Sequence, residues 1–162
     1  MKFLPVLLGL AITNAFPAEA EYPKMGPDIY DTRADGTAQV ATAVAKAKEE
    51  HKHVLVELGA NWCIWCRRLS HTFESNPAVA KALTDNFILV LVDVNHRHGK
   101  SRNDAVNDRY GNPMELGLPV LVVLEADGKQ LTTQETGALV GGKDDHDPAK
   151  VIAFLTKWAP KK

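Results

Sequence analysis

The sequence predicts an α/β fold in which helices cover both faces of a central mixed β-sheet. Two observations support this prediction. Segments with helical periodicity alternate along the chain with short apolar runs of strand length. The only two cysteines, Cys63 and Cys66, lie where one of these runs passes into a helical segment. The predicted order (helix, strand, helix, strand, helix, strand, hairpin strand, helix) is typical of a mixed sheet covered on both faces.

The composition is that of one ordinary globular domain. The chain has 162 residues, of which 45% are hydrophobic and 24% charged, and this is enough for one well-filled core. The formal net charge is −1. So weak a charge gives no reason to expect nucleic acid or an anionic membrane surface as a partner, and we expect partners that react with the thiols.

The first 20 residues are interpreted as a signal peptide. Lys2 gives a basic start, residues 3–12 are almost wholly apolar, and residues 18–20 (Ala-Glu-Ala) have the small-x-small pattern of a cleavage site. The apolar stretch is too short to span a bilayer. An uncleaved membrane anchor and a buried N-terminal helix are the alternatives. Cleavage near Ala20 predicts a periplasmic or secreted protein, which works in an oxidising compartment.

Residues 21–36, rich in Pro, Gly and Asp, form a predicted extended lead-in to a domain over residues 37–162. Apolar residues in the segment 37–50 are spaced as on one face of a helix. A β-branched run at 54–58 predicts a strand, and helical character returns at 66–73. The Cys-x-x-Cys pair is therefore expected at a strand-to-helix junction.

Asn76 and Pro77 have the pattern of a helix start, with Asn as the cap and Pro at the first helical position. Residues 87–94 are a continuous apolar run, which we expect to be a strand buried on both faces at the centre of the sheet. The remaining predicted elements are a helix at 102–110, a strand at 120–124, its hairpin partner at 130–134 after an Asp-Gly turn, and a helix at 148–158.

Two segments resemble the thioredoxins. Residues 54–66 (VLVELGANWCIWC) are similar to the thioredoxin active-site strand and loop, and residues 117–129 (GLPVLVVLEADGK) to its cis-proline loop and hairpin. The resemblance covers residues 37–158 and implies the thioredoxin fold. The long stretch between the two motifs, together with the predicted export, makes the chain more similar to the exported thioredoxin-like family, related to the C-terminal domain of bacterial thiol:disulfide interchange proteins.

The placement of the two cysteines predicts their chemistry. Cys63 lies at the N-terminal end of a helix, where free backbone N–H groups and the helix dipole lower the pKa of a thiol, so we expect it to be the nucleophile. Cys66, one turn further on, is expected to be the resolving thiol that attacks a mixed disulfide. A static structural disulfide is the alternative, although a bridge across so short a loop constrains the unfolded chain little.

The resemblance also implies roles for neighbours of the pair. Glu57 occupies the position of a buried Asp in thioredoxins and is expected to accept the Cys66 proton, directly or through water. The alternative is an outward-facing, solvated Glu. Pro119 is expected to be cis and packed against the cysteines, with the backbone of Leu118 pairing with an extended substrate; the alternative is a trans Pro that starts a strand. Trp62 either shields the disulfide and contacts substrate or is simply buried.

The dipeptide between the cysteines, Ile64-Trp65, departs from the Gly-Pro of thioredoxins. This dipeptide tunes the reduction potential in that family, so the direction of electron flow does not follow from the sequence. The arginines that follow, Arg67 and Arg68, either add positive charge near the thiolate or form a solvated helix face, and we favour the second interpretation. No cofactor is predicted. The spaced histidines are interpreted as surface residues and not as metal ligands.

The sequence therefore favours an exported thiol:disulfide oxidoreductase, a reductase or isomerase of protein disulfides, that uses the Cys63/Cys66 dithiol-disulfide couple. The expected partners are disulfide-containing protein substrates and a membrane-bound or small-thiol electron donor, with no nucleic acid. A monomer is expected. The alternative is a non-catalytic binding module of thioredoxin fold, in which the Cys-x-x-Cys pair holds a metal or docks a partner.

Overall fold

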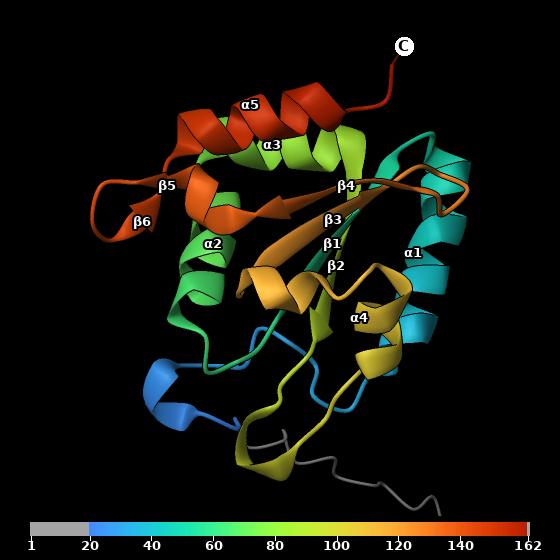
Figure 1. Cartoon of the computed structure of the whole chain (residues 1–162). Helices are drawn as coiled ribbons and strands as arrows, with labels where there is room; N and C mark the ends of the chain where they lie inside the picture. The colour runs from blue at the N-terminus through green and yellow to red at the C-terminus, as the bar shows by residue number, and fades with distance from the viewer. Residues whose placement is uncertain (1–19, 162) are drawn as a thin grey trace, which may run out of the picture.

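A computed structural model describes residues 20–161, so nearly all of the predicted signal peptide lies outside the described residues. The helices and longer strands are α1 (Gly36–Glu50), β1 (His53–Gly59), α2 (Ile64–Ser75), α3 (Pro77–Asn86), β2 (Phe87–Asp93), α4 (Asp104–Arg109), β3 (Val120–Leu124), β4 (Gln130–Glu135) and α5 (Pro148–Trp158). Two short strands, β5 (Val140–Gly141) and β6 (Asp145–His146), form a separate antiparallel pair. Figure 1 shows their arrangement.

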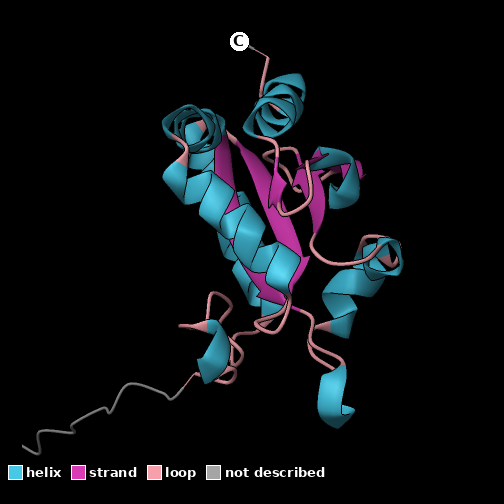
Figure 2. Cartoon of the chain, turned by 90° about the vertical axis from the view of Figure 1, so that its left-hand side faces the viewer, coloured by secondary structure: helices cyan, strands magenta, loops and turns pink. Residues whose placement is uncertain are grey.

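The main sheet is mixed and has the strand order β2-β1-β3-β4. β1 runs parallel to β2 and antiparallel to β3, and β3 runs antiparallel to β4. Helices lie on both faces of the sheet (Figure 2), as the sequence predicts. The described residues therefore have the α/β architecture of a thioredoxin fold.

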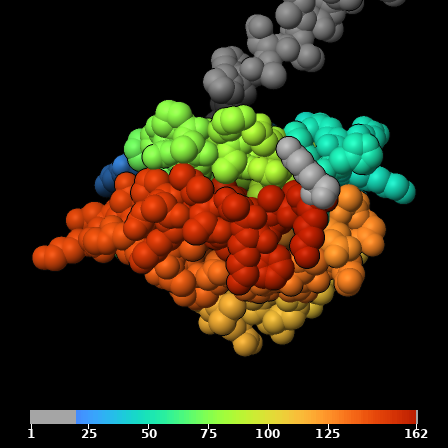
Figure 3. Space-filling model, turned by 90° about the horizontal axis from the view of Figure 1, so that it is seen from above, coloured from blue at the N-terminus to red at the C-terminus, as the bar shows by residue number. Residues whose placement is uncertain are grey.

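Alternation along β1 divides the core into two halves. Val54, Val56 and Leu58 pack with the buried faces of α1 and α4. Leu55, which points to the opposite face, packs with buried residues of α2, α3 and α5. α5 lies alongside α3 on this second face (Figure 3). Glu57 shares the orientation of Leu55 and so faces the side of the sheet on which α2 begins.

One predicted position in the sheet is wrong. The apolar run at 87–94 was expected at the centre, but β2 is an edge strand, and β1 and β3 occupy the centre. Ile88 and Leu89 are only partly buried, whereas every residue of β3 is buried. Because helices cover both faces of the sheet, an edge strand carries the same continuous apolar pattern as a central one.

The helix boundaries follow their capping residues. α1 begins at Gly36 because the Asp35 carboxylate accepts from the backbone N–H groups of Thr37 and Ala38. The helix predicted from Cys66 begins two residues earlier, at Ile64, so Cys63 is its N-cap. Asn76 caps α3 as predicted, through its bonds from the N–H groups of Ala78 and Val79.

Replacing Asn76 by Ala removes both side-chain cap bonds of α3. We expect Asn76→Ala to lower the free energy of unfolding by about 1 kcal/mol, measured by urea denaturation. Lys81→Ala changes an exposed residue of the same helix and is the control, with an expected change below about 0.5 kcal/mol. Equal midpoints for the two variants would contradict the assigned cap.

Candidate active site

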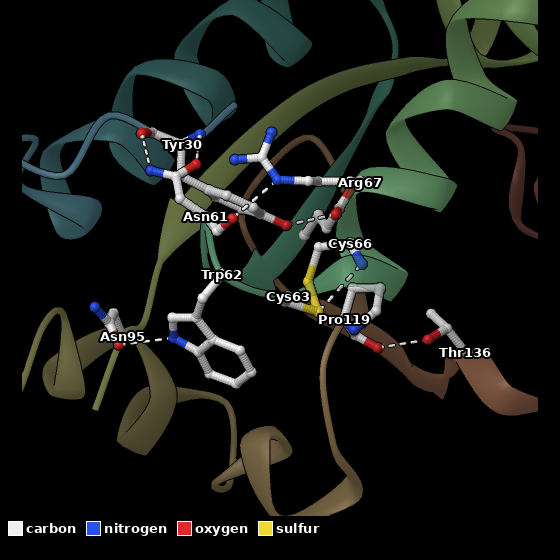
Figure 4. The surroundings of a disulfide bond; sticks show 10 residues. Tyr30, Asn61, Trp62, Cys63, Cys66, Arg67, Asn95, Pro119 and Thr136 are labelled. Atoms are coloured by element: carbon white, nitrogen blue, oxygen red, sulfur yellow. Dashed lines mark hydrogen bonds between the residues drawn. A yellow bond between two sulfur atoms is a disulfide. The ribbon is translucent and has the colours of Figure 1, made fainter. Parts of the chain in front are cut away.

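Cys63 and Cys66 form a disulfide at the start of α2, with their Cα atoms 5.3 Å apart (Figure 4). Cys63 is the N-cap of the helix, and its Sγ accepts from the Cys66 backbone N–H at 3.1 Å. Cys66 is fully buried, while Cys63 is 4% exposed. The sulfur of Cys63 therefore lies where the N–H groups and dipole of a 12-residue helix can stabilise a thiolate.

Glu57 is buried at the centre of the sheet, so the alternative of a solvated side chain is wrong. Its Oε1 accepts from the Tyr30 hydroxyl at 2.5 Å. Its Oε2 has no hydrogen-bond partner among residues 20–161. Burial raises the pKa of Glu57 to about 7, although the bond from Tyr30 acts to lower it. A carboxyl group with this pKa can take up and release a proton near neutral pH.

Sequence reasoning missed Tyr30. It lies in the lead-in, 1% exposed, in one cluster with the two cysteines. Asn61, two residues before Cys63, holds it: Asn61 Oδ1 accepts from the N–H groups of Ile29 and Tyr30, and Asn61 Nδ2 donates to the Tyr30 carbonyl, at 2.9–3.0 Å. The sequence offered one signal, because the amide side chain of Asn61 lies two residues before Cys63 and can bind a backbone segment. The sequence does not indicate that this segment is the one that carries Tyr30.

The Leu118–Pro119 peptide bond is cis, as the resemblance implies, so the alternative of a trans proline is wrong. Pro119 is buried, and its carbonyl accepts from the Thr136 hydroxyl at 2.6 Å (Figure 4). Leu118 is half-buried and packs against the cluster that contains the two cysteines. The proline loop and the disulfide, far apart in the sequence, are thus adjacent in the fold.

Trp62 is half-buried and fixed in orientation. Its indole Nε1 donates to Asn95 Oδ1 at 2.8 Å, and the Arg97 guanidinium stacks 3.4 Å from its ring centroid. The ring packs against the cysteine cluster and is only partly buried, so the alternative of a simply buried Trp is wrong, and the contact with substrate stays a prediction.

The two residues between the cysteines have different environments. Ile64 is 50% exposed. The guanidinium carbon of Arg68 instead lies 4.5 Å from the Trp65 ring centroid. The Trp65 and His146 rings pack edge to face, with their centroids 5.7 Å apart. Arg68 also pairs with Asp144 at 3.3 Å. Trp65 is therefore held by His146 of β6 and by Arg68 of α2, which is itself paired with Asp144 between β5 and β6.

The arginines do not form a solvated face, contrary to the interpretation that the sequence favoured. Arg67 is half-buried, and it donates through Nε to the Asn61 carbonyl at 2.9 Å and through Nη1 to the Pro27 carbonyl at 2.7 Å. It therefore joins α2 to the lead-in. Arg67 contacts the lead-in, and Arg68 contacts Asp144 between β5 and β6. The local sequence cannot indicate that these two distant segments lie against α2.

Two grooves meet beside the disulfide. Residues that line the first include Trp62, Cys63, Ile64, Trp65 and Leu118. The second shares Trp65, Gly117 and Leu118 with the first and continues past Pro119 toward His146. An extended chain laid along these grooves would cross both Cys63 and the proline loop.

The described part of the chain shows no grouping of three or more His, Cys, Asp or Glu side chains that could hold a metal ion. Within residues 20–161, no helix is both long and apolar enough to cross a membrane.

The fold and the disulfide at a helix N-terminus beside a cis-proline define a protein of the thioredoxin class. A family model described as thioredoxin-like matches residues 35–126, and the chain belongs to this thioredoxin-like family. The crystal structure of a disulphide isomerase from Xylella fastidiosa is 32% identical, with a TM-score of 0.69 over 80% of this chain and 95% of that one.

Curated relatives agree with this placement. The chain is 26% identical over 94% of its length to the thiol:disulfide interchange protein DsbD of Klebsiella pneumoniae, of which it covers 24%. It is 27% identical to the disulfide bond reductase DsbH of Chlamydia pneumoniae, over 65% of this chain and 69% of that protein. The chain spans about a quarter of the length of the DsbD that it matches. By family, relatives and disulfide, it is a thioredoxin-like thiol:disulfide oxidoreductase.

The raised pKa of Glu57 makes stability depend on pH. The carboxyl is protonated up to about 7 in the folded state but ionises near its ordinary value of 4.5 when unfolded. The stabilisation that the protonated carboxyl group gives the folded state is therefore complete below pH 4.5. As the pH rises toward 7, the free energy of unfolding falls by about 3 kcal/mol. We expect Glu57→Gln to remove this loss, measured by urea unfolding of the oxidised protein between pH 4.5 and 7.5. Parallel stability curves for the variant and the wild type would contradict the assignment.

Proposed function

We propose that the protein is an exported reductase or isomerase of protein disulfides that works through the Cys63/Cys66 couple. One observation carries this proposal: the disulfide lies at the N-terminus of α2, where it borders a groove and packs in one cluster with Tyr30, whose hydroxyl donates to the buried carboxyl group of Glu57. A purely structural bridge needs neither the groove nor the carboxyl group.

The proposed reaction starts from the dithiol. The Cys63 thiolate attacks a substrate disulfide, a bond forms between Cys63 and one substrate sulfur, and the other substrate sulfur leaves as a thiolate. Cys66 then loses its proton and attacks Cys63, so the mixed disulfide breaks, the second substrate sulfur leaves, and the Cys63–Cys66 bond forms. Two electrons pass from the protein to the substrate. Glu57 is the proposed final acceptor of the Cys66 proton.

The grooves support a protein substrate rather than a small molecule. Trp65 and Leu118 line both grooves, Cys63 lines the first, and Pro119 lines the second. The backbone of Leu118 is proposed to pair with an extended segment of the substrate. Ile64 is an exposed apolar contact at the same place. A membrane-bound protein or a small thiol is the proposed source of electrons.

The names of the relatives support reduction or isomerisation as the direction. One relative is named a disulphide isomerase and another a disulfide bond reductase. Measurement of the reduction potential of the Cys63/Cys66 couple tests the direction: a value near −270 mV, that of thioredoxin, supports reduction, whereas a value near −120 mV would refute it.

A variant without the resolving thiol tests the mechanism. We expect Cys66→Ser to accumulate mixed disulfides through Cys63 with exported proteins, since the second attack is lost. They are detected by non-reducing electrophoresis and identified by mass spectrometry. Cys63→Ser is the matched control and should trap none. Normal function of the protein with both cysteines replaced would refute the catalytic proposal and favour a binding module.

Export is tested on the native chain. Because residues 18–20 have the pattern of a signal-peptidase site, we expect the mature protein to begin at Glu21 and to appear in the periplasmic or secreted fraction. N-terminal sequencing after fractionation measures both. Ala18→Asp together with Ala20→Asp should block processing. A mature chain that still begins at Met1 and stays with the cytoplasmic fraction would refute export.

A further inference from the structure

Tyr30 is a buried polar residue beside the disulfide that the reaction described above does not use. Its side chain points from the lead-in toward the Cys63–Cys66 disulfide (Figure 4). It is 1% exposed, and its hydroxyl donates to Glu57 Oε1 at 2.5 Å. The same ring packs in one buried cluster with both cysteines. Tyr30 therefore contacts the proposed proton acceptor and lies next to the proposed proton donor.

Gly59 shows how close the hydroxyl lies to Cys66. Glu57 and Gly59 are two residues apart on β1, so both face the same side of the sheet. A Cβ atom added to Gly59 would overlap the Tyr30 hydroxyl and would lie 2.8 Å from Cys66 Sγ. The hydroxyl oxygen and the sulfur thus border one small space, which exists because residue 59 has no side chain.

The position of Tyr30 does not depend on the lead-in alone. Asn61 binds the backbone of Tyr30 through one donor and one acceptor group. The carbonyl of Asn61 in turn accepts from Arg67 of α2 at 2.9 Å. The hydroxyl is therefore positioned by residues on either side of the cysteine pair.

The charges around Tyr30 suit a residue that passes a proton on without keeping a charge. Glu57 on β1 and Asp93 on β2 disfavour a tyrosinate, and Arg67 on α2 opposes them only in part. Burial above all, and then the charges of Glu57 and Asp93, raise the pKa of Tyr30 well above its ordinary value of 10.0, so the hydroxyl keeps its proton at neutral pH. Its oxygen still has lone pairs with which to accept a second hydrogen bond.

We propose that Tyr30 relays the proton of Cys66 to Glu57. The inference rests on the proposed function. As the Cys66 thiol gives its proton to the Tyr30 oxygen, the Tyr30 hydroxyl gives its own proton to Glu57 Oε1, so Tyr30 stays neutral. The Cys66 thiolate attacks Cys63 in the mixed disulfide, the Cys63–Cys66 bond forms, and the substrate sulfur leaves with the electron pair. Glu57 later releases the proton to solvent.

The test follows the two steps separately in the reduced full chain mixed with oxidised glutathione. Quenched samples analysed by mass spectrometry give the rates at which the Cys63–glutathione mixed disulfide forms and disappears. We expect Tyr30→Phe to leave formation unchanged and to slow disappearance by about tenfold or more, less than the roughly 10²–10⁴-fold supplied by a complete general base. The pH midpoint of disappearance should rise, because Glu57 loses the hydrogen bond that lowers its pKa.

Three comparisons keep the test specific. Tyr110→Phe changes a buried tyrosine whose hydroxyl has no hydrogen-bond partner among the described residues, and it should alter neither rate. Gly59→Ala keeps the Tyr30 residue but overlaps its hydroxyl, so it displaces the hydroxyl from its place beside Cys66, and it should slow disappearance as Tyr30→Phe does. In a Glu57→Gln background, Tyr30→Phe should slow the step no further, because one relay cannot be broken twice.

The relay is overturned if the mixed disulfide of Tyr30→Phe disappears at the wild-type rate and with the wild-type pH midpoint. It is also overturned if Tyr30→Phe slows disappearance in the Glu57→Gln background by as much as it does in the wild type. Either result leaves the proposed function intact, because the wild-type chain would still exchange disulfides. If the wild-type chain forms no mixed disulfide at all, the proposed function itself is refuted. Urea unfolding of each variant in its oxidised form establishes that it is folded before the rates are compared.

Discussion

The burial of the Glu57 carboxyl group in the central strand is the constraint around which the site is organised. β1 is hydrogen-bonded on both edges and covered on both faces, so the Glu57 side chain is not exposed to bulk water and its neutral form is favoured. One of its two oxygens is satisfied by Tyr30, and this bond brings the lead-in over the sheet. Asn61 and Arg67 then fix the lead-in to the loop and helix that carry the cysteines. A polar group that is expensive to bury thus ties together three segments that are distant in the sequence.

The accessible side of the disulfide is built in a different way, from aromatic rings held by cations. Arg97 fixes Trp62, and Arg68 fixes Trp65 with help from His146. Such contacts hold a ring in place while leaving part of it uncovered. Ile64 alone projects outward between the cysteines. The unusual Ile-Trp dipeptide therefore combines one residue anchored in the fold with one that is free to meet a substrate.

The local sequence predicted most elements because their signals are local. Capping by Asn76, the Asp-Gly turn before β4 and the spacing of apolar residues in α5 act within a few residues. It placed β2 at the centre of the sheet because apolar continuity reports burial and not strand order. It favoured a solvated Arg67 because periodicity cannot reveal that another segment covers that helix face. Tyr30 was missed for the same reason, since its partner Glu57 is 27 residues away.

By itself, the sequence determined the fold class, the cysteine pair at a strand-to-helix junction, and the identity of Glu57, Leu118 and Pro119 as neighbours of that pair. The fold class and the junction follow from periodicity and spacing within short segments, whereas Glu57, Leu118 and Pro119 follow from the resemblance of two motifs to those of the thioredoxins. Only the tertiary structure decided that Glu57 is buried, that one of its oxygens is occupied by Tyr30, and that Trp65 contacts His146 of the distant strand β6. The physical reason is that burial and hydrogen-bond partners are properties of packing between distant segments, and a carboxyl group acquires its proton affinity from that packing.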